Sequence, residues 1–197
     1  MPPVTEQNEV DAYYLADPTH PRAAGVMWPA IIERRIDKLY ETALRPDKVV
    51  WNELFQPSGA LGNYAVKVRF AYLLGWIGGD IYKDLLTLAK IRNRFAHVIE
   101  AKDFADQQLS AWLKNMACYK LLPRLVESLT DKAKADEKMR GPAFTARNTL
   151  EDPVSSFRFC IDQMLHHLDQ CQENMARNLS GLTENWMTGA DLPEKNK

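Results

Sequence analysis

Eight consecutive residues, Lys90 to His97, carry the side chains of this chain that are best suited to chemistry. They read Lys-Ile-Arg-Asn-Arg-Phe-Ala-His and hold three cations, one carboxamide and one of the four histidines. A guanidinium binds phosphate through two parallel hydrogen bonds, and a neutral imidazole takes up a proton near pH 7. The segment therefore combines parts that can bind an anion and move a proton.

The spacing of these residues decides what they can do together. Asn93 and His97 lie four residues apart and share a helix face, with Arg92 about 100° away around the axis. If the helix frays at its end, all three can converge on one small anion. They are sufficient for metal-independent RNA cleavage, in which a base deprotonates the ribose 2′-hydroxyl and a cation stabilises the phosphate. A second chain facing the first would supply the general acid. Lys90 and Arg94 are candidate contacts to nucleic acid or another anion.

A structural interpretation of the same residues stays open beside the functional one. His97 near a helix C-terminus interacts favourably with the helix dipole when charged. Arg92 can pair with Asp84 or with a more distant acid, and Asn93 can cap a neighbouring helix. Arg92 interrupts an apolar stripe, and such breaks occur at functional sites and also where an arginine stem is buried.

The hydrophobic pattern predicts an all-α fold, a single bundle of about six to seven helices. No segment shows the period-two alternation between turn residues that is typical of strands. The expected helices span residues 22–44, 47–55, 63–77, 81–97, 104–116 and 118–129, with a long last helix over 153–180.

Several expectations concern how the first helices lie. Pro29 inside 22–44 predicts either a kink or a late helix start. The short helix 47–55 is expected to turn Val50, Leu54 and Trp51 inward. Helix 63–77 is apolar on nearly all sides and is therefore expected to be central and mostly buried.

Other expectations concern helix ends. Gly78-Gly79 is expected to end helix 63–77, and Asp80 and Asp103 are the expected N-caps of the two helices that follow. Residues 130–152 are rich in charge and contain Gly141-Pro142, which predicts a helix tail followed by a loop.

The last expected helix carries an unusually regular apolar seam. Its members recur at alternating steps of three and four residues: Val154, Phe157, Ile161, Met164, Leu168, Cys171 and Met175. This heptad spacing is typical of antiparallel packing inside a bundle, and the alternative is a dimerising helix.

Length and composition indicate one globular domain. The chain has 197 residues, 46% of them apolar, and a net charge of −1. Residues 67–102 hold seven Lys or Arg against three acids, so a local basic surface is expected within a nearly neutral chain. We expect an N-terminal arm over 1–19 with a helical turn near 10–15, a domain over 20–180, and a tail over 181–197 anchored by Trp186 and Met187.

The composition gives no indication of a cofactor, a metal or a membrane segment. The three cysteines, Cys118, Cys160 and Cys171, lack metal-ligand spacing and are expected to be buried thiols in a reducing compartment. His166-His167 are adjacent and point about 100° apart, so they cannot chelate one ion. No signal peptide or membrane span is visible, and a cytoplasmic location is expected.

Further site types lack their motifs in this sequence. There is no phosphate-binding glycine loop and no nucleophile elbow. A DNA-reading helix-turn-helix needs a polar, basic second helix, whereas the helix after Gly78-Gly79 is apolar through Leu88.

Two stretches resemble the mannitol operon repressor family over roughly residues 22–120. They are an apolar helix with a glycine near its end and a second helix that ends in the motif already described: Ala71-Tyr72-Leu73-Leu74-Gly75-Trp76-Ile77 and Ile91-Arg92-Asn93-Arg94-Phe95-Ala96-His97. The family is similar to the wider HEPN class of helical domains, whose signature of Arg, a following polar residue and a later His is matched by Arg92, Asn93 and His97. Arg94 departs from the acid or small residue that is frequent at its position.

The resemblance implies a HEPN-like helical bundle, usually dimeric, with a regulatory or ribonucleolytic role. The first expectation is a regulatory protein that acts as a homodimer through a protein or RNA partner, without direct helix-turn-helix DNA binding. The alternative is a HEPN-type metal-independent ribonuclease, or toxin-like protein, that uses Arg92 and His97 across the dimer. A third interpretation is an interaction module in which the motif only stabilises the fold. The enzymatic alternative requires Arg92 and His97 to be reachable from solvent.

Overall fold

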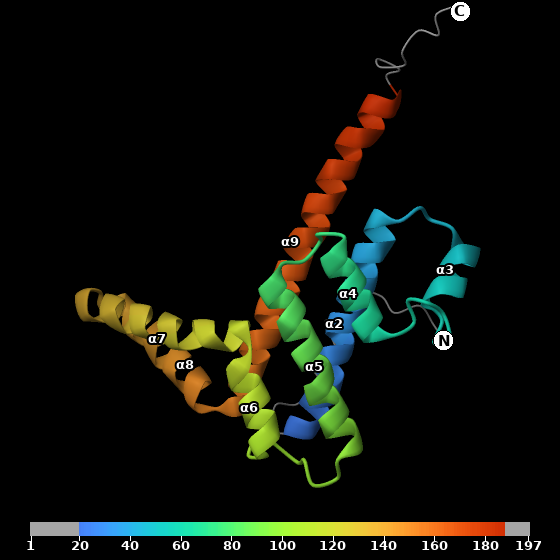
Figure 1. Ribbon diagram of the computed structural model, residues 1–197. Helices are drawn as coiled ribbons and strands as arrows, with labels where there is room; N and C mark the ends of the chain where they lie inside the picture. Colours follow the sequence, from blue (N-terminus) through green and yellow to red (C-terminus); the bar gives the residue numbers. More distant parts are fainter. Residues whose placement is uncertain (1–19, 188–197) are drawn as a thin grey trace, which may run out of the picture.

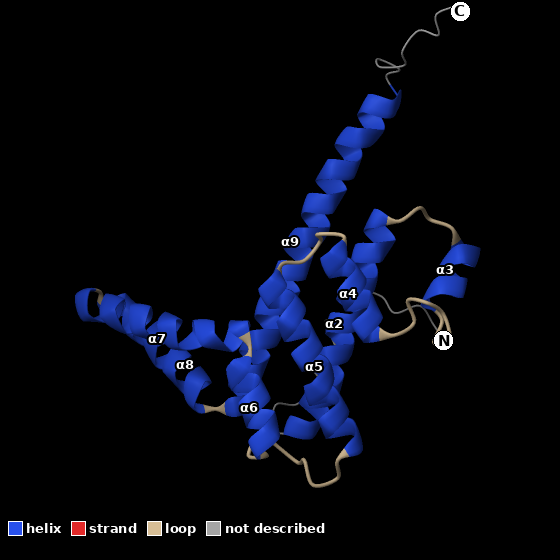
Figure 2. Cartoon of the chain, viewed as in Figure 1, coloured by secondary structure: helices blue, strands red, loops and turns tan. Residues whose placement is uncertain are grey.

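The computed structural model describes residues 20–187, with side chains up to residue 178, and this part is helical without strands (Figures 1 and 2). The all-α prediction is confirmed. The helical turn expected near 10–15 lies outside the described residues. The anchor expected at Trp186 and Met187 concerns side chains that lie outside the described ones. The helices are α2 (Pro21–Ala43), α3 (Lys48–Phe55), α4 (Tyr64–Leu73), α5 (Gly79–His97), α6 (Gln107–Asn115), α7 (Ala117–Ala135), the 3₁₀ turn η1 (Glu137–Met139), α8 (Arg140–Glu151) and α9 (Pro153–Met187).

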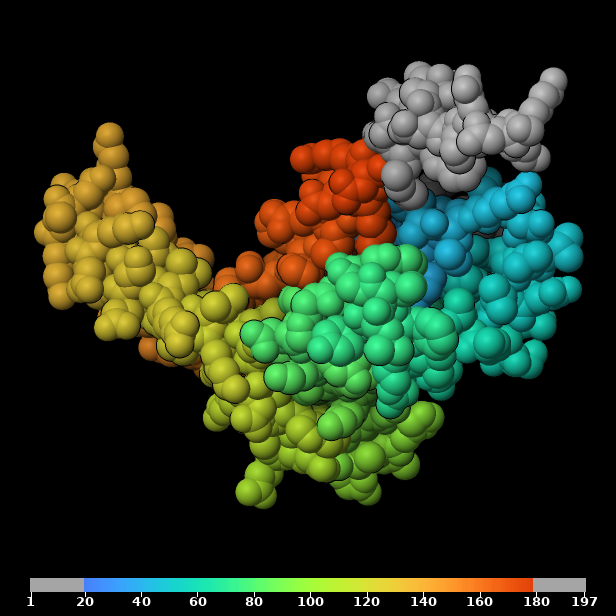
Figure 3. Space-filling model, turned by 45° about the horizontal axis from the view of Figure 1, so that its top comes forward, coloured from blue at the N-terminus to red at the C-terminus, as the bar shows by residue number. Residues whose placement is uncertain are grey.

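Three helices form the body of the bundle: α9 packs along α2, and α5 packs against the other side of α2. α4 lies on α5, and α6 joins α5 to α7. The α7–α8 hairpin extends away from the body, as Figure 3 shows. At the end of the bundle opposite the C-terminus of α5, α9 continues beyond its neighbours (Figure 1). No helix within residues 20–187 is long and apolar enough to cross a membrane.

Four buried aromatic rings form the centre of the core. Trp28 of α2 contacts Phe157 of α9 with ring centroids 5.6 Å apart, and Phe104 lies 5.1 Å from Phe157 and 5.2 Å from Phe95 of α5. Tilted and edge-to-face pairs of this kind add to the stabilisation from burial. The cluster fixes α5 against α2 and α9, and thereby positions the motif at the end of α5.

Phe95 fits the bundle because α2 has a glycine opposite its ring. A Cβ added to Gly25 would lie 2.1 Å from Cδ2 of Phe95. Gly25→Ala is therefore expected to lower the free energy of unfolding by about 1–3 kcal/mol, since the buried ring must shift to admit the methyl group. Thermal or urea denaturation measures the change.

The control for this prediction is Gly141→Ala on α8, where an added Cβ meets nothing within 4 Å. Alanine favours a helix over glycine, so this variant is expected to be unchanged or stabilised by up to about 1 kcal/mol. Equal stability of Gly25→Ala and Gly141→Ala would contradict the tight fit at Phe95.

The prediction that the apolar helix before Gly78 is mostly buried is wrong. α4 ends at Leu73, and it buries only the stripe that contains Val68 and Ala71. Leu73 is 77% exposed and Leu74 51% exposed. Only one side of α4 meets the body, so the apolar residues on its other sides remain at the surface. Gly75, with φ +73°, makes the turn expected at Gly78-Gly79.

The predicted N-caps and one inward-facing residue also require correction. Gly78 is the N-cap of α5, and Asp80 lies in its first turn. Asp106 caps α6, so this helix begins three residues later than expected, while Asp103 accepts a hydrogen bond from the backbone N–H of Ala105 inside the preceding loop. On α3, Val50 is 48% exposed because this short helix covers little of the core.

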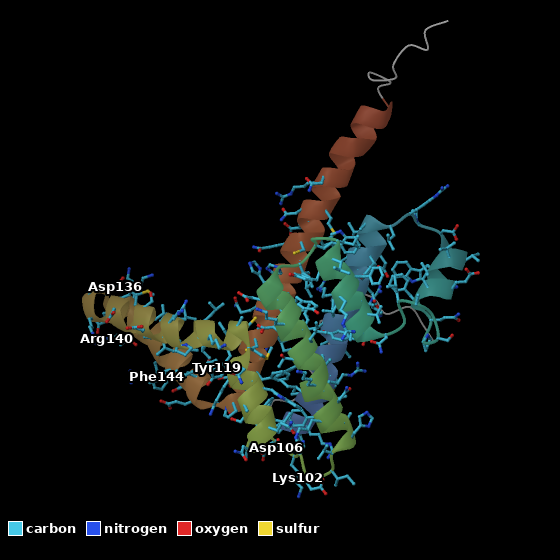
Figure 4. All side chains as sticks on the ribbon, in the orientation of Figure 1. Lys102, Asp106, Tyr119, Asp136, Arg140 and Phe144 are labelled. Atoms are coloured by element: carbon cyan, nitrogen blue, oxygen red, sulfur yellow. The ribbon has the colours of Figure 1, made fainter. Side chains whose placement is uncertain are left out.

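The loop predicted within residues 130–152 is a helical hairpin. α7 continues through Pro123 to Ala135, and α8 follows after the short turn η1. Asp136 and Arg140 lie near the tip of this hairpin (Figure 4). Proline is tolerated in a first helical turn, where its missing N–H has no intrahelical partner, so Pro142 does not prevent α8 from forming.

The long last helix begins at Pro153 as predicted and continues to Met187, beyond the expected end at 180. Its seam is buried inside the bundle from Phe157 to Leu168. The main neighbour is parallel and not antiparallel: Trp28 meets Phe157, and Arg35 pairs with Asp169 further along both helices. In α2, Pro29 lies inside one continuous helix from Pro21 to Ala43, so the late helix start that was one expectation for Pro29 does not occur.

Candidate functional site

The motif occupies the last two turns of α5 and is held there by two residues. Ile91 and Phe95 are fully buried, while the helix stays regular through His97. The fraying on which convergence of the three motif residues depends is therefore absent from this conformation.

Asn93 and His97 lie on the solvent side of α5, and both are exposed. Within the described part of the chain, neither side chain makes a hydrogen bond or an ion pair. His97 thus meets the requirement of solvent access, and its imidazole is open to a ligand or a second chain.

Arg92 is engaged with α2. Its Nη1 lies 3.1 Å from Oε2 of Glu33, and its side chain is 39% exposed. The alternative pairing with Asp84 does not occur. An anion that binds Arg92 must compete with Glu33 or share the guanidinium with it.

Glu33 also links Arg92 to a buried cation that sequence reasoning missed. Lys67 of α4 is 4% exposed, and its Nζ lies 3.3 Å from Oε1 of Glu33 and 2.7 Å from Oδ1 of Asp37. Burial raises the pKa of Asp37 above its ordinary value, and this effect outweighs the hydrogen bond from Lys67. The available signal was a lysine in the apolar helix α4 and two acids spaced i, i+4 on α2.

Tyr64 connects α4 to α5 beside this network. Its hydroxyl donates to the backbone carbonyl of Leu85 at 3.2 Å. Burial, followed by the negative charge of Glu33, raises the pKa of this phenol, so it remains a neutral hydrogen-bond donor at physiological pH.

The Arg94 guanidinium makes three hydrogen bonds to side chains of the same chain. Its Nε and Nη2 donate to the two carboxylate oxygens of Asp106 at 2.8 and 2.6 Å, and its Nη1 donates to Oε1 of Gln108 at 2.7 Å. Asp106 lies near the start of α6 (Figure 4). Arg94 therefore fastens the loop between α5 and α6, whereas Lys90 is exposed.

The Arg94 guanidinium, with backbone N–H groups of α6, lowers the pKa of Asp106 to about 2. Because the folded-state pKa lies below that of the unfolded chain, the stability from this pair is present above about pH 4 and is lost as the pH falls toward 2.

Arg94→Gln is expected to raise the pKa of Asp106 toward its ordinary value. Carbon NMR titration of the Asp106 carboxyl group measures this pKa, with Lys90→Gln as the control. An unchanged pKa in Arg94→Gln would contradict the role given to this pair.

Comparison with known proteins adds a family to this geometry. Residues 15–173 match the family model described as mannitol repressor, which is most of the chain. The chain belongs to the mannitol repressor family. The expected resemblance is thus confirmed, and it extends beyond the range 22–120 into α9.

A solved structure resembles this mannitol repressor family member in fold. It is described as a possible transcriptional regulator, YggD, from Shigella flexneri 2a str. 2457T. It shares 16% sequence identity, aligns over 83% of this chain and 98% of its own, and has a TM-score of 0.57. No match was found among curated protein sequences.

Two further groups of the mannitol repressor family member bear on its chemistry. Asp84, 2% exposed, accepts hydrogen bonds from the backbone N–H groups of Ala117 and Cys118 at the start of α7. Burial, reinforced by the negative charge of Asp84, raises the pKa of the Cys118 and Cys160 thiols, so both are unreactive. Within residues 20–187, no cluster of His, Cys, Asp and Glu could hold a metal ion.

Proposed function

We propose that this protein is a regulator of the mannitol repressor type that acts by binding a protein or RNA partner, as a homodimer in the cytoplasm. The observation that carries the proposal is the family match over residues 15–173. The solved structure of similar fold, described as a possible transcriptional regulator, agrees with a regulatory role.

The helices of the described part support binding of a partner over direct reading of DNA. A reading helix must present polar and basic side chains to a groove. In the candidate pair around Gly78-Gly79, the second helix is α5, which buries Leu85, Leu88, Ile91 and Phe95. The end of α4 leaves Leu73 and Leu74 at the surface, and exposed apolar residues grouped in this way are typical of interaction sites.

The regulatory proposal is tested in a deletion strain with a reporter for the sugar-alcohol uptake genes. Reporter expression is expected to rise on deletion and to fall again with the wild-type gene, but not with a Leu73→Glu, Leu74→Glu double variant. Val49→Glu, at an exposed apolar residue of α3, is the surface control. An unchanged reporter on deletion, or a purified protein that binds the promoter duplex with sequence specificity, would overturn the proposal.

A second candidate function is HEPN-type, metal-independent RNA cleavage. The observation that favours it is the exposed His97, which has no partner within the described chain, next to the half-exposed Arg92. His97 would act as the base and Arg92 would bind the phosphate, with a second chain supplying the acid.

This candidate is tested by incubating single-stranded RNA with purified protein in EDTA. Wild type is expected to cleave, His97→Ala and Arg92→Ala to lose at least about a hundredfold in rate, and Lys83→Ala, at an exposed lysine near the start of α5, to remain close to wild type. The rate per chain should also rise with protein concentration, because two chains form one site. Absence of cleavage by the wild type removes this candidate and leaves the regulatory proposal intact.

A further inference from the structure

A cavity lies between the end of α2 and α3, and none of the motif residues lines it. Its volume is about 390 Å³, within the range of roughly 300–1,000 Å³ that is usual for small-molecule sites. The short helix α3 stands beside the body of the bundle, after the loop from α2 (Figure 1), and none of its residues is fully buried. Formation of the core therefore does not account for this helix, whereas a role as the wall of a binding site does.

The apolar wall of the cavity is built around Trp51. Its half-buried indole stacks on Phe55, with ring centroids 3.8 Å apart and planes inclined by 6°. Phe55 in turn meets the buried Tyr40 edge-on at 5.3 Å, so contacts that reach the core hold the indole in place. Leu44 and Pro46 complete the apolar part of the lining. A fixed, partly open aromatic ring of this kind is a surface on which a flat ring can stack.

Three polar side chains of the lining have no partner. Within the described residues, Arg45, Lys48 and Asn52 are exposed, and their side chains make no hydrogen bond or ion pair. A guanidinium binds a phosphate through two parallel hydrogen bonds, and an ammonium group adds a second positive charge. Arg45 and Lys48 lie on the two sides of the turn into α3, so together they can bind the double negative charge of a phosphate monoester.

The two acids of the lining are already engaged. Oδ1 of Asp47 accepts hydrogen bonds from the backbone N–H groups of Val49 and Val50 at 3.0 and 3.1 Å, and thereby caps α3. Oε1 of Glu41 lies 2.6 Å from Nη1 of Arg34. With Arg34 included, three cations stand against two acids around the cavity, which favours an anion over a cation as its ligand.

These features together select the class of ligand. An inorganic anion leaves the Trp51 wall unused, and an apolar peptide leaves Arg45 and Lys48 without partners. A sugar phosphate needs several hydrogen bonds to its hydroxyl groups, whereas Asn52 is the single unpartnered neutral polar side chain of this lining. We propose that the cavity binds a nucleoside monophosphate, with its base against Trp51 and its phosphate on Arg45 and Lys48. The Asn52 amide, which is both a donor and an acceptor, then meets the edge of the base.

Isothermal titration calorimetry of the full chain with AMP tests the site. The wild type is expected to bind AMP. Adenosine, which lacks the phosphate, and ribose 5-phosphate, which lacks the base, are each expected to bind at least about tenfold more weakly. These comparisons use the wild type alone, so they do not depend on the folding of a variant. Absence of AMP binding overturns the proposal, and so does equal binding of AMP and either of the two partial ligands.

Substitutions locate the bound nucleotide. Arg45→Gln is expected to weaken AMP binding about tenfold, because it removes a charged contact to the phosphate. Lys132→Gln, at an exposed lysine of α7, is the control and is expected to bind AMP like the wild type. Equal affinities of these two variants for AMP place the nucleotide elsewhere and overturn this site. The proposal goes beyond the regulatory role and does not rest on it, so its failure leaves the reporter test of regulation unaffected.

Discussion

Replacing Asp84 with alanine is expected to lower the free energy of unfolding by about 3–4 kcal/mol. The carboxylate is 2% exposed and accepts two hydrogen bonds of 2.8 Å, from the backbone N–H groups of Ala117 and Cys118. Its removal leaves two buried donors without an acceptor, and each costs about 1–3 kcal/mol. It also removes the charge that stabilises the N-terminus of α7.

Urea denaturation of matched variants measures this effect. Asp84→Asn keeps one acceptor oxygen and turns an amide group toward the second donor, so an intermediate loss is expected. Asp80→Ala changes an exposed acid on the same helix and is expected to stay within about 0.5 kcal/mol of wild type. Equal stability of Asp84→Ala and Asp80→Ala would refute the role of the buried carboxylate.

The second large effect is expected for Lys67→Met, with a loss of about 3 kcal/mol near pH 7. The ammonium group lies between Glu33 and Asp37 and is almost completely buried. Methionine fills a similar volume, so the loss comes from the two carboxylates that remain close together without this cation.

The loss in Lys67→Met should shrink as the pH is lowered. The folded-state pKa of Asp37 is already raised by burial, and removal of Lys67 raises it further. A folded state that binds the proton more tightly than the unfolded chain gains stability as the pH falls through that pKa. Denaturation at pH 7 and pH 4.5 measures the trend. Lys67→Met combined with Asp37→Asn should be less pH-dependent, and a pH-independent loss in the single variant would contradict this account.

The sequence was informative wherever one helix determined the answer by itself. The spacing of Ile91 and Phe95 correctly predicted that the motif is anchored in the core, and Pro153 marked the start of α9. That Asn93 and His97 share one face of α5 follows from their i, i+4 spacing. These features depend on helical periodicity, which is a local property.

The features that sequence reasoning missed depend on partners distant along the chain. Glu33 and Arg92 are 59 residues apart, and Asp84 and Ala117 are 33 residues apart. α4 looked buried because it is apolar nearly all round, yet a pattern does not tell how many sides are covered by neighbours. The α7–α8 hairpin was missed because charge suggested a loop, although a two-helix hairpin leaves most of its surface in water.

The excess length of α9 has a consequence for how the two ends of the molecule influence each other. α9 projects at one end of the bundle, and α5 ends with His97 at the other (Figure 1). A partner bound at the exposed His97 therefore does not reach the projecting part of α9. Substitutions at the two ends should have additive effects on stability, because sites more than about 10 Å apart without shared neighbours act independently.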